Sequence, residues 1–303
     1  VCSILFLISN IDITITNIAL PTIANDFSVN LLSMNSVVVS FLVAYAVAIP
    51  LVEFMVDRFG LKNILIVACC LFAISSLLCA VSTNIDQLIL SRILQGISSG
   101  FFTPIARSVV IKISDVDSLP INLSNVQTLG MLGQAIGPFI GSYVVHLLDW
   151  KYIFYINIPL CVIAVFIIIL FFDNHTFNKK VIYNLDYKGY SLISIFIIFI
   201  FLLLNDFGNG IYYNKNVFIS GSIASVLFYL LLNHILNYKD KPILNFKLLF
   251  SNNTLKHSLW ISLIARQYTS GLSFFIMIFF HELHYTNLHF ASFRANLFNL
   301  KFT

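Results

Sequence analysis

Four ionisable residues lie inside stretches that are otherwise apolar: Asp12, Arg92, Arg107 and Arg266. A charged side chain in hydrocarbon costs at least ~2.5 kcal/mol, so such a residue faces a partner or a water-filled path. A carboxylate beside a cation can bind a proton in one arrangement and release it in another, because moving the cation changes its hold on the proton. We therefore expect Asp12 to bind a proton or a cationic compound, with Arg92 setting the affinity. The alternative is a structural ion pair that locks two helices together.

The depth of these residues allows contact between them but does not establish it. Counted from the outer ends of the predicted spans over 1–21 and 86–112, Asp12 lies about 9 residues inward and Arg92 about 6. At 1.5 Å per residue the two depths differ by roughly 5 Å.

Three glycines recur every four residues in one apolar stretch: Gly133, Gly137 and Gly141. On a helix they form one bare stripe, which lets a neighbouring backbone come close. Pro138 removes an amide donor and leaves the carbonyl of Gln134 without its usual partner, which membrane helices tolerate. We interpret this segment as a hinge that seals the helices against proton leak. The alternative is helix packing alone.

The composition indicates that lipid is the solvent. Of 303 residues 59% are hydrophobic and 10% are charged, which is too apolar for a soluble domain. The net charge of +4 is dispersed, so nucleic acid is not an expected partner. We predict an all-α, multi-pass transmembrane bundle with about nine spans. These lie near residues 1–21, 36–56, 63–82, 86–112, 122–147, 152–172, 187–205, 217–236 and 257–281.

The distribution of lysine and arginine predicts a cytoplasmic N-terminus, since cytoplasmic loops carry the excess of these residues. With this orientation the outer loops and helix ends hold only Lys151 and Lys215. The inner ones hold Arg58, Lys62, Lys112, Lys179, Lys180, Lys188, Lys239, Lys241, Lys247 and Lys256.

Several motifs together resemble one family of transporters. They are DITITNIALP (Asp12 to Pro21), DRFGLK (Asp57 to Lys62), RILQG (Arg92 to Gly96), the glycine-proline stretch GQAIGPFIG (Gly133 to Gly141) and WKYIFYINIP (Trp150 to Pro159). Each is weak alone, but their order and spacing resemble the EmrB/QacA type of drug:proton antiporter, within the major facilitator superfamily. PILNFKLLF (Pro242 to Phe250) and ARQYTSG (Ala265 to Gly271) are similar to its MdtD/HsrA-like members.

The resemblance implies a domain organisation. Residues 1–172 would form an N-terminal six-helix bundle, and residues 173–256 a cytoplasmic connector, two inserted helices and a second connector. Residues 257–281 would be the first helix of a C-terminal bundle, followed by a divergent tail over 282–303. Members of this family have fourteen helices, so we interpret the chain as a C-terminally truncated copy.

The resemblance also implies a function, namely proton-driven efflux of amphipathic or cationic drugs across the bacterial inner membrane. No cofactor is expected, and the proton gradient supplies the driving force. Two alternatives are a major facilitator carrier for a metabolite and a non-transporting remnant with at most a binding role. The implied coupling residues are Asp12, Arg92, Gln95, Arg107 and Arg266. The implied gating loop comprises Asp57, Arg58, Gly60 and Lys62. The alternative interpretation of these residues is a solvated turn.

Other activities find no support in the sequence. No GxxxxGK[ST] phosphate loop is present, so direct ATP coupling is not expected. An intramembrane enzyme is not expected either, because no paired set of metal ligands is recognisable. The sequence from His281 to His284 lacks HExxH spacing, and we interpret it as an interface anchor rather than a metal site. The expected partners are the lipid bilayer, small amphipathic substrates and protons. An envelope adaptor protein stays an open possibility.

Overall fold

The computed structural model describes residues 2–172, 185–208, 215–237, 251 and 253–265. Within these ranges the regular structure is helical and contains no β-strand, which confirms the all-α prediction. The chain divides into two compact units, Val1–Ile243 and Leu244–Thr303. In the second unit residues 253–265 are helical. The rest of the ninth predicted span and the tail over 282–303 lie outside the described residues.

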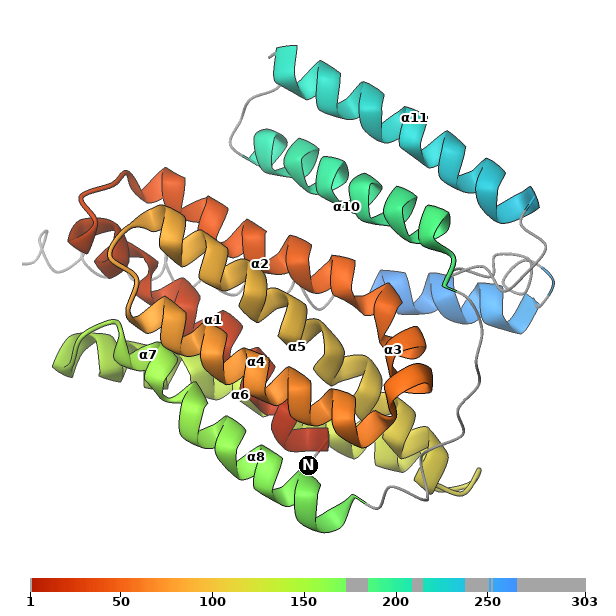
Figure 1. The fold of residues 1–303 in the computed structure, drawn as a ribbon, viewed down its shortest axis with the longest axis horizontal. Helices are drawn as coiled ribbons and strands as arrows, with labels where there is room; N and C mark the ends of the chain where they lie inside the picture. The colour runs from red at the N-terminus through yellow and green to blue at the C-terminus, as the bar shows by residue number, and fades with distance from the viewer. Residues whose placement is uncertain (1, 173–184, 209–214, 238–250, 252, 266–303) are drawn as a thin grey trace, which may run out of the picture. The chain divides into compact units, whose positions relative to one another are not determined.

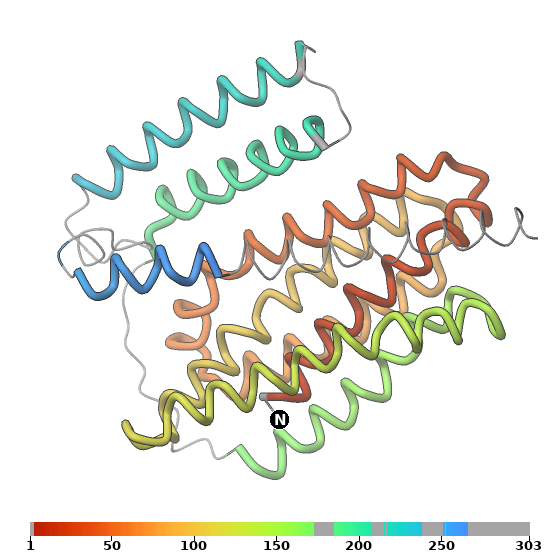
Figure 2. Tube along the Cα trace, turned by 180° about the vertical axis from the view of Figure 1, so that it is seen from behind, coloured from red at the N-terminus to blue at the C-terminus, as the bar shows by residue number. Residues whose placement is uncertain are grey.

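The described part of the first unit is a bundle of helices (Figures 1 and 2). Two 3₁₀ segments, η1 (Leu31–Met34) and η2 (Ile49–Leu51), flank the helix α2. The α-helices are α1 (Cys2–Asp26), α2 (Asn35–Ala48), α3 (Val52–Phe59), α4 (Leu61–Ala80), α5 (Ile85–Ile113), α6 (Leu119–Leu147), α7 (Tyr152–Tyr155), α8 (Asn157–Phe171), α10 (Tyr187–Gly208) and α11 (Lys215–Asn237).

Seven of the nine predicted spans correspond to helical segments that are long and apolar enough to cross a membrane. The second of them, Leu31–Phe59, is interrupted at η2 because Pro50 has no amide hydrogen to donate. The predicted span over 86–112 is also one continuous helix, α5. It is not among the seven membrane-length apolar segments, because it contains more polar side chains. Much of that helix is buried inside the bundle, so its polar residues can contact the neighbouring helices.

The glycine stripe of α6 packs directly against α1, as its spacing predicts (Figure 2). A Cβ atom added to Gly133 would lie 2.8 Å from the carbonyl oxygen of Leu7. One added to Gly141 would lie 3.3 Å from the Cα atom of Ile15, and one on Gly137 would overlap the side chain of Thr14. The two backbones are therefore close enough that side chains larger than glycine do not fit between them.

A second pair of glycines brings α5 equally close to α2. A Cβ atom added to Gly100 would lie 2.8 Å from both the carbonyl oxygen of Tyr45 and the Cβ atom of Ala48. At Gly96 it would overlap the carbonyl oxygen of Phe41. The sequence analysis placed Gly96 only in the RILQG motif and did not predict this contact. The bundle thus contains two close helix pairs, α1 with α6 and α2 with α5.

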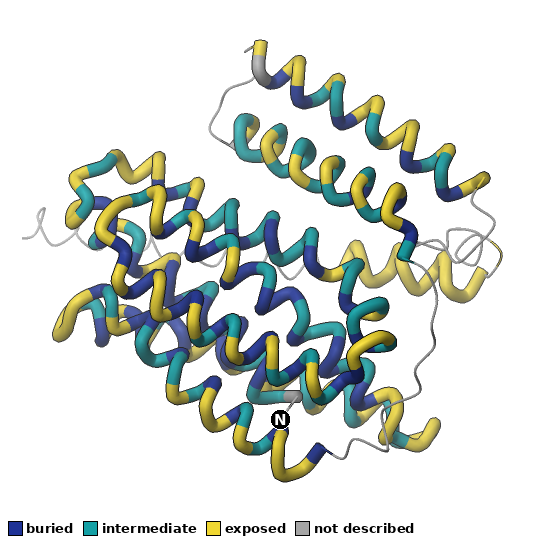
Figure 3. The backbone as a smooth tube through the Cα atoms, viewed as in Figure 1, coloured by how far each residue is buried: buried dark blue, intermediate teal, exposed yellow. Residues whose placement is uncertain are grey.

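Two apolar cores fill the interior, and buried side chains follow the inward faces of the helices (Figure 3). On α4, Phe72 belongs to one core and Cys79 to the other; on α1, Ile8 and Ile15 are divided in the same way. Between the cores, these helices carry buried polar residues. The polar residues therefore form a layer between two apolar regions.

The turn between α3 and α4 depends on Gly60. Its φ and ψ angles are 86° and 146°, a conformation that is essentially restricted to glycine. We expect Gly60→Ala to lower the free energy of unfolding by about 1–3 kcal/mol, because the added side chain strains this backbone. Thermal unfolding in detergent micelles measures this loss. Gly221→Ala in α11 is the control, since helix propensity favours alanine there; equal stability of the two variants would contradict the prediction.

The first turn of α10 is tied to both α11 and α2. Asp186 Oδ1 accepts the backbone N–H of Gly189 at 2.8 Å and caps the helix. The same carboxylate lies 2.9 Å from Nε2 of His234 on α11. The hydroxyl of Tyr190 donates to the carbonyl oxygen of Val47 at 3.4 Å. These contacts fix one end of the α10–α11 hairpin.

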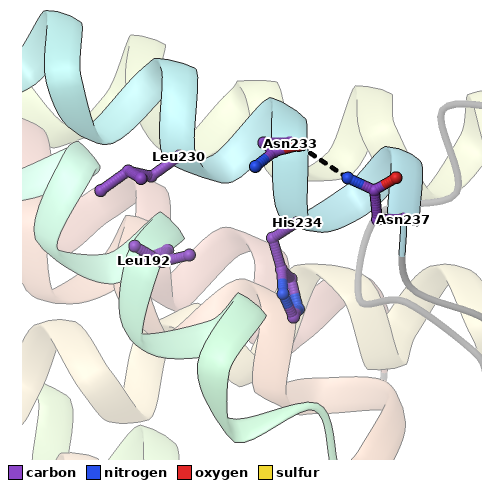
Figure 4. Close-up of a pocket in the computed structure, with 5 residues that line it drawn as sticks. All are labelled: Leu192, Leu230, Asn233, His234 and Asn237. Atoms are coloured by element: carbon purple, nitrogen blue, oxygen red, sulfur yellow. Dashed lines mark hydrogen bonds between the residues drawn. The ribbon is translucent and has the colours of Figure 1, made fainter.

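A pocket of about 420 Å³ opens at the same end of the hairpin (Figure 4). Within it, Nδ2 of Asn237 donates to Oδ1 of Asn233 at 2.6 Å. The lining residues are Leu192, Leu230, Asn233, His234 and Asn237. Three polar side chains of α11, those of Asn233, His234 and Asn237, therefore line one pocket at this end.

Candidate functional site

The polar layer centres on Asp12 of α1, whose side chain accepts three hydrogen bonds. Nη1 of Arg92 donates to Oδ2 at 2.7 Å, and this contact is also an ion pair. Nε2 of Gln95 and Nδ2 of Asn157 both donate to Oδ1, at 3.0 Å and 2.7 Å. Asp12 is 2% exposed and Arg92 is 1% exposed, so this is a charge pair withdrawn from solvent. The structure thus joins two predicted residues whose contact the sequence left undecided.

Gln95 fixes the positions of the Asp12 and Arg92 side chains relative to each other, because it makes hydrogen bonds to both. Its Oε1 accepts from Nη1 of Arg92 at 2.6 Å, while its Nε2 donates to Asp12 and to Oγ of Ser76 at 2.8 Å. Arg92 and Gln95 lie three residues apart on α5 and therefore on the same helix face. The guanidinium carbon of Arg92 also lies 4.3 Å from the ring centre of Phe41, which is a cation–π contact.

Two members of the cluster were missed by the sequence analysis. Asn157 begins α8 and donates to Asp12, while Ser76 of α4 accepts from Gln95. Both side chains are buried. Asn157 lies within the WKYIFYINIP motif, so an amide in an apolar stretch was the available signal. Ser76 gave no such signal, because a lone serine in a membrane helix commonly bonds its own backbone.

The hydrogen bonds of the cluster depend on the charge of Asp12. With Asp12 ionised, its oxygens accept from three donors on two other helices, α5 and α8. A proton on Asp12 would remove the charge that makes these bonds strong. A carboxylate that loses its cation in an apolar interior takes up a proton rather than staying charged. Proton binding and the contact with Arg92 therefore compete.

The remaining arginines predicted for coupling do not join this cluster. Arg107 is 15 residues further along α5, which corresponds to about 22 Å. It is partly buried, and its Nε atom has no hydrogen-bond partner among the described residues. Arg266 lies outside the described residues. The structure therefore brings together Asp12, Arg92 and Gln95 but not Arg107.

The predicted gating residues surround the turn at Gly60. Nζ of Lys62 donates to the carbonyl oxygens of Ile169 and Phe172, at 3.1 Å and 2.7 Å. Arg58 lies over the aromatic rings of Phe54 and Phe59 on its own helix. Lys62 thus connects this turn to the end of α8.

Asp57, the other gating residue, lines a cleft of about 340 Å³ between α3 and α5. Glu53 lies one turn earlier on the same helix, and Lys112 of α5 lies across the cleft. Two carboxylates and a lysine therefore line the same cleft.

The predicted hinge residues Gly133, Gly137, Pro138 and Gly141 lie on α6, which stays helical through the proline. They face the segment of α1 between Leu7 and Ile18. That segment carries Asp12, so the stripe sets the position of the helix that bears the carboxylate.

A metal site is not indicated by the described part of the chain. Among these residues no group of three or more histidine, cysteine, aspartate or glutamate side chains is placed to hold a metal ion. The segment from His281 to His284 lies outside the described residues.

Curated relatives resemble part of the chain. MdtD from Yersinia pestis (strain Pestoides F), whose name assigns it to multidrug resistance, is 35% identical over 190 residues, which is 63% of this chain and 40% of the relative. MdtD from Yersinia pseudotuberculosis serotype O:1b (strain IP 31758) gives the same values. The chain thus spans about two fifths (40%) of the length of these relatives.

Solved structures share the arrangement of helices. The proton:xylose symporter XylE bound to 6-bromo-6-deoxy-D-glucose gives a TM-score of 0.51 at 14% identity, covering 78% of this chain and 53% of that one. The inward-open form of XylE from E. coli gives 0.51 at 15% identity, with coverage of 77% and 55%. At these identities the similarity concerns the fold alone.

The sequence also matches the family described as the Major Facilitator Superfamily, over residues 2–300. Together with the membrane-length helices and the buried charge cluster, this match shows that the chain belongs to the Major Facilitator Superfamily and is a multi-pass membrane protein of a transporter family, not an enzyme.

Proposed function

We propose that this chain belongs to a proton-coupled exporter of amphipathic or cationic drugs, with Asp12 as the group that binds the proton. The observation that carries the proposal is the buried Asp12–Arg92–Gln95 cluster, to which four helices of an apolar bundle contribute, namely α1, α4, α5 and α8. Burying a charge pair in an apolar bundle costs free energy of desolvation. Its presence here therefore supports a functional or a strong structural role. The proton gradient supplies the driving force, without a bound cofactor.

The nature of the substrate follows from the chemistry of the carboxylate. When Arg92 moves away, Asp12 accepts either a proton or a substrate cation, so the two compete for one site. The similarity to MdtD, whose name refers to multidrug resistance, supports drugs as the cargo. We place the protein in the bacterial inner membrane with a cytoplasmic N-terminus, because lysine and arginine gather on the loops that this orientation puts inside.

The test is release of protons on addition of a cationic dye. The purified chain, in detergent and in weakly buffered solution, receives ethidium while the pH is recorded. We expect the unchanged chain to release protons and Asp12→Asn to release none, because the amide has no proton to exchange. Asp149→Asn is the matched control: Asp149 is exposed, and its Oδ2 lies 3.7 Å from Nζ of Lys151.

The outcomes separate the candidate functions. Equal proton release by Asp12→Asn and the unchanged chain would remove Asp12 from the mechanism. Release on addition of a sugar or another metabolite but not ethidium would favour the metabolite carrier. Release with neither would favour a non-transporting role.

A further inference from the structure

Helix α8 is held at its two ends by side chains from two different candidate functional segments. Its first residue, Asn157, contacts Asp12, and the carbonyls at its other end accept hydrogen bonds from Lys62. We propose that α8 transmits the protonation state of Asp12 to the turn that carries Lys62, with Asn157 as the positioning residue. This inference rests on the proposed function, since it gives a regulatory connection to the same proton site.

The contact at the first end depends on the charge of Asp12. Nδ2 of Asn157 lies 2.7 Å from Oδ1 of Asp12 and 3.4 Å from Oγ of Ser76. Asn157 is 1% exposed, so water cannot replace the carboxylate as acceptor. A hydrogen bond to an ionised acceptor is about twice as strong as a neutral one. Protonation of Asp12 therefore weakens the attachment of α8.

The charged group that the described residues place against Asp12 is Arg92. Cys79 of α4 and Cys161 of α8 are the other titratable groups near Asp12, and Sγ of Cys79 lies 3.6 Å from Oε1 of Gln95. In the described part of the chain, the side chains of Arg92 and Cys79 make no hydrogen bond to Asn157. The bond between Asn157 and Asp12 thus responds to the charge on Asp12 itself.

The contact at the second end satisfies backbone carbonyls at the C-terminal end of α8. The last turn of α8 contains no basic residue, and its carbonyls carry partial negative charge. Lys62 of α4 supplies the positive charge, at 3.1 Å from the oxygen of Ile169 and 2.7 Å from that of Phe172. Since Lys62 follows Gly60 by two residues, a shift of this end of α8 acts directly on the turn.

The helix between these ends can move as one body. Its 15 residues span about 22 Å. Buried small residues, Cys161 and Ala164, face the interior, where α8 packs against α4. Val162, Phe166 and Leu170 are exposed, as lipid-facing residues are. Among the described residues, the polar attachments of α8 to other helices therefore lie at its two ends.

The experiment measures the reactivity of Lys62 toward an acylating reagent by mass spectrometry, on the full chain in lipid nanodiscs. A lysine that donates two hydrogen bonds reacts slowly, so its release is visible as faster acylation. Lys112, which is exposed, serves as the reference within each sample. We expect Asp12→Asn, which mimics the protonated state, and Asn157→Leu, which removes the positioning amide, each to raise the reactivity of Lys62 several-fold.

Ser9→Ala is the matched control, because it removes a buried hydrogen bond of α1 to Ser99 that does not involve α8. An equal rise in that variant would show general loosening and would overturn the inference. Unchanged Lys62 reactivity in both Asp12→Asn and Asn157→Leu would also overturn it. Loss of dye-driven proton release together with unchanged Lys62 reactivity would overturn the connection through α8 and leave the proposed function in place.

Discussion

Replacing Asp12 with alanine is expected to lower the free energy of unfolding by about 3–5 kcal/mol, because it leaves Arg92 charged and buried without a partner. Arg92 is 1% exposed, and its Nη1 would keep only the bond to Gln95. Adding Arg92→Met to Asp12→Ala should recover most of the loss, since the double variant buries no charge. Unfolding in detergent of graded denaturing strength, followed by tryptophan fluorescence, measures the change.

The exposed pair of Asp149 and Lys151 is the control for this prediction. Its side chains are 48% and 39% exposed, so Asp149→Ala should change the free energy of unfolding by no more than about 1 kcal/mol. If Asp12→Ala were as stable as Asp149→Ala, the buried pair would not be the electrostatic centre of the bundle. If the double variant were no more stable than Asp12→Ala, the loss would come from packing and not from the unpaired charge.

Replacing Gly133 with leucine should separate α1 from α6. A Cβ atom at this position would lie 2.8 Å from the carbonyl oxygen of Leu7, a backbone atom that cannot rotate away. Overpacking of this kind costs typically 1–3 kcal/mol, and it would also move Asp12 away from its donors. We expect lower thermal stability and, in the fraction that folds, loss of dye-driven proton release.

Gly221→Leu on α11 is the matched control for Gly133→Leu. The nearest atom to a Cβ there is Cδ1 of Leu203, at 3.6 Å, which is ordinary contact distance. This variant should keep its stability and its proton release. Unchanged stability of Gly133→Leu would contradict the close contact. Lowered stability with full proton release in the folded fraction would leave the stripe with a packing role only.

From the sequence, the residues of the buried cluster could be recognised more readily than the contacts between them. Asp12 and Arg92 were recognisable because charges in apolar stretches are rare and costly. Their contact was not, because membrane helices tilt and their ends lie at different levels, so residue counts measure depth poorly. Arg107 is charged in the same way as Arg92, yet it lies elsewhere along α5. Only the packing of the helices distinguishes the two.

The fold, too, was predictable in its local features but not in the contacts between helices. Glycine spacing predicted that one face of α6 packs closely against another helix, but not that the other helix is α1. The break at η2 followed Pro50, whereas the apolar pattern predicted one continuous span over 36–56. Asn157 was present in a recognised motif, but its contact with Asp12 depends on α8 lying beside α1, which no local pattern shows.

The two glycine contacts have a mechanical consequence. Each joins a pair of helices too tightly for sliding within the pair, whereas α1 and α5, one from each pair, meet through the salt bridge of Asp12 and Arg92 and through the hydroxyls of Ser9 and Ser99. Shear is therefore easiest along this boundary. Neutralising one carboxylate lowers the resistance to shear at this boundary, so a single chemical event selects both the moment and the plane of movement.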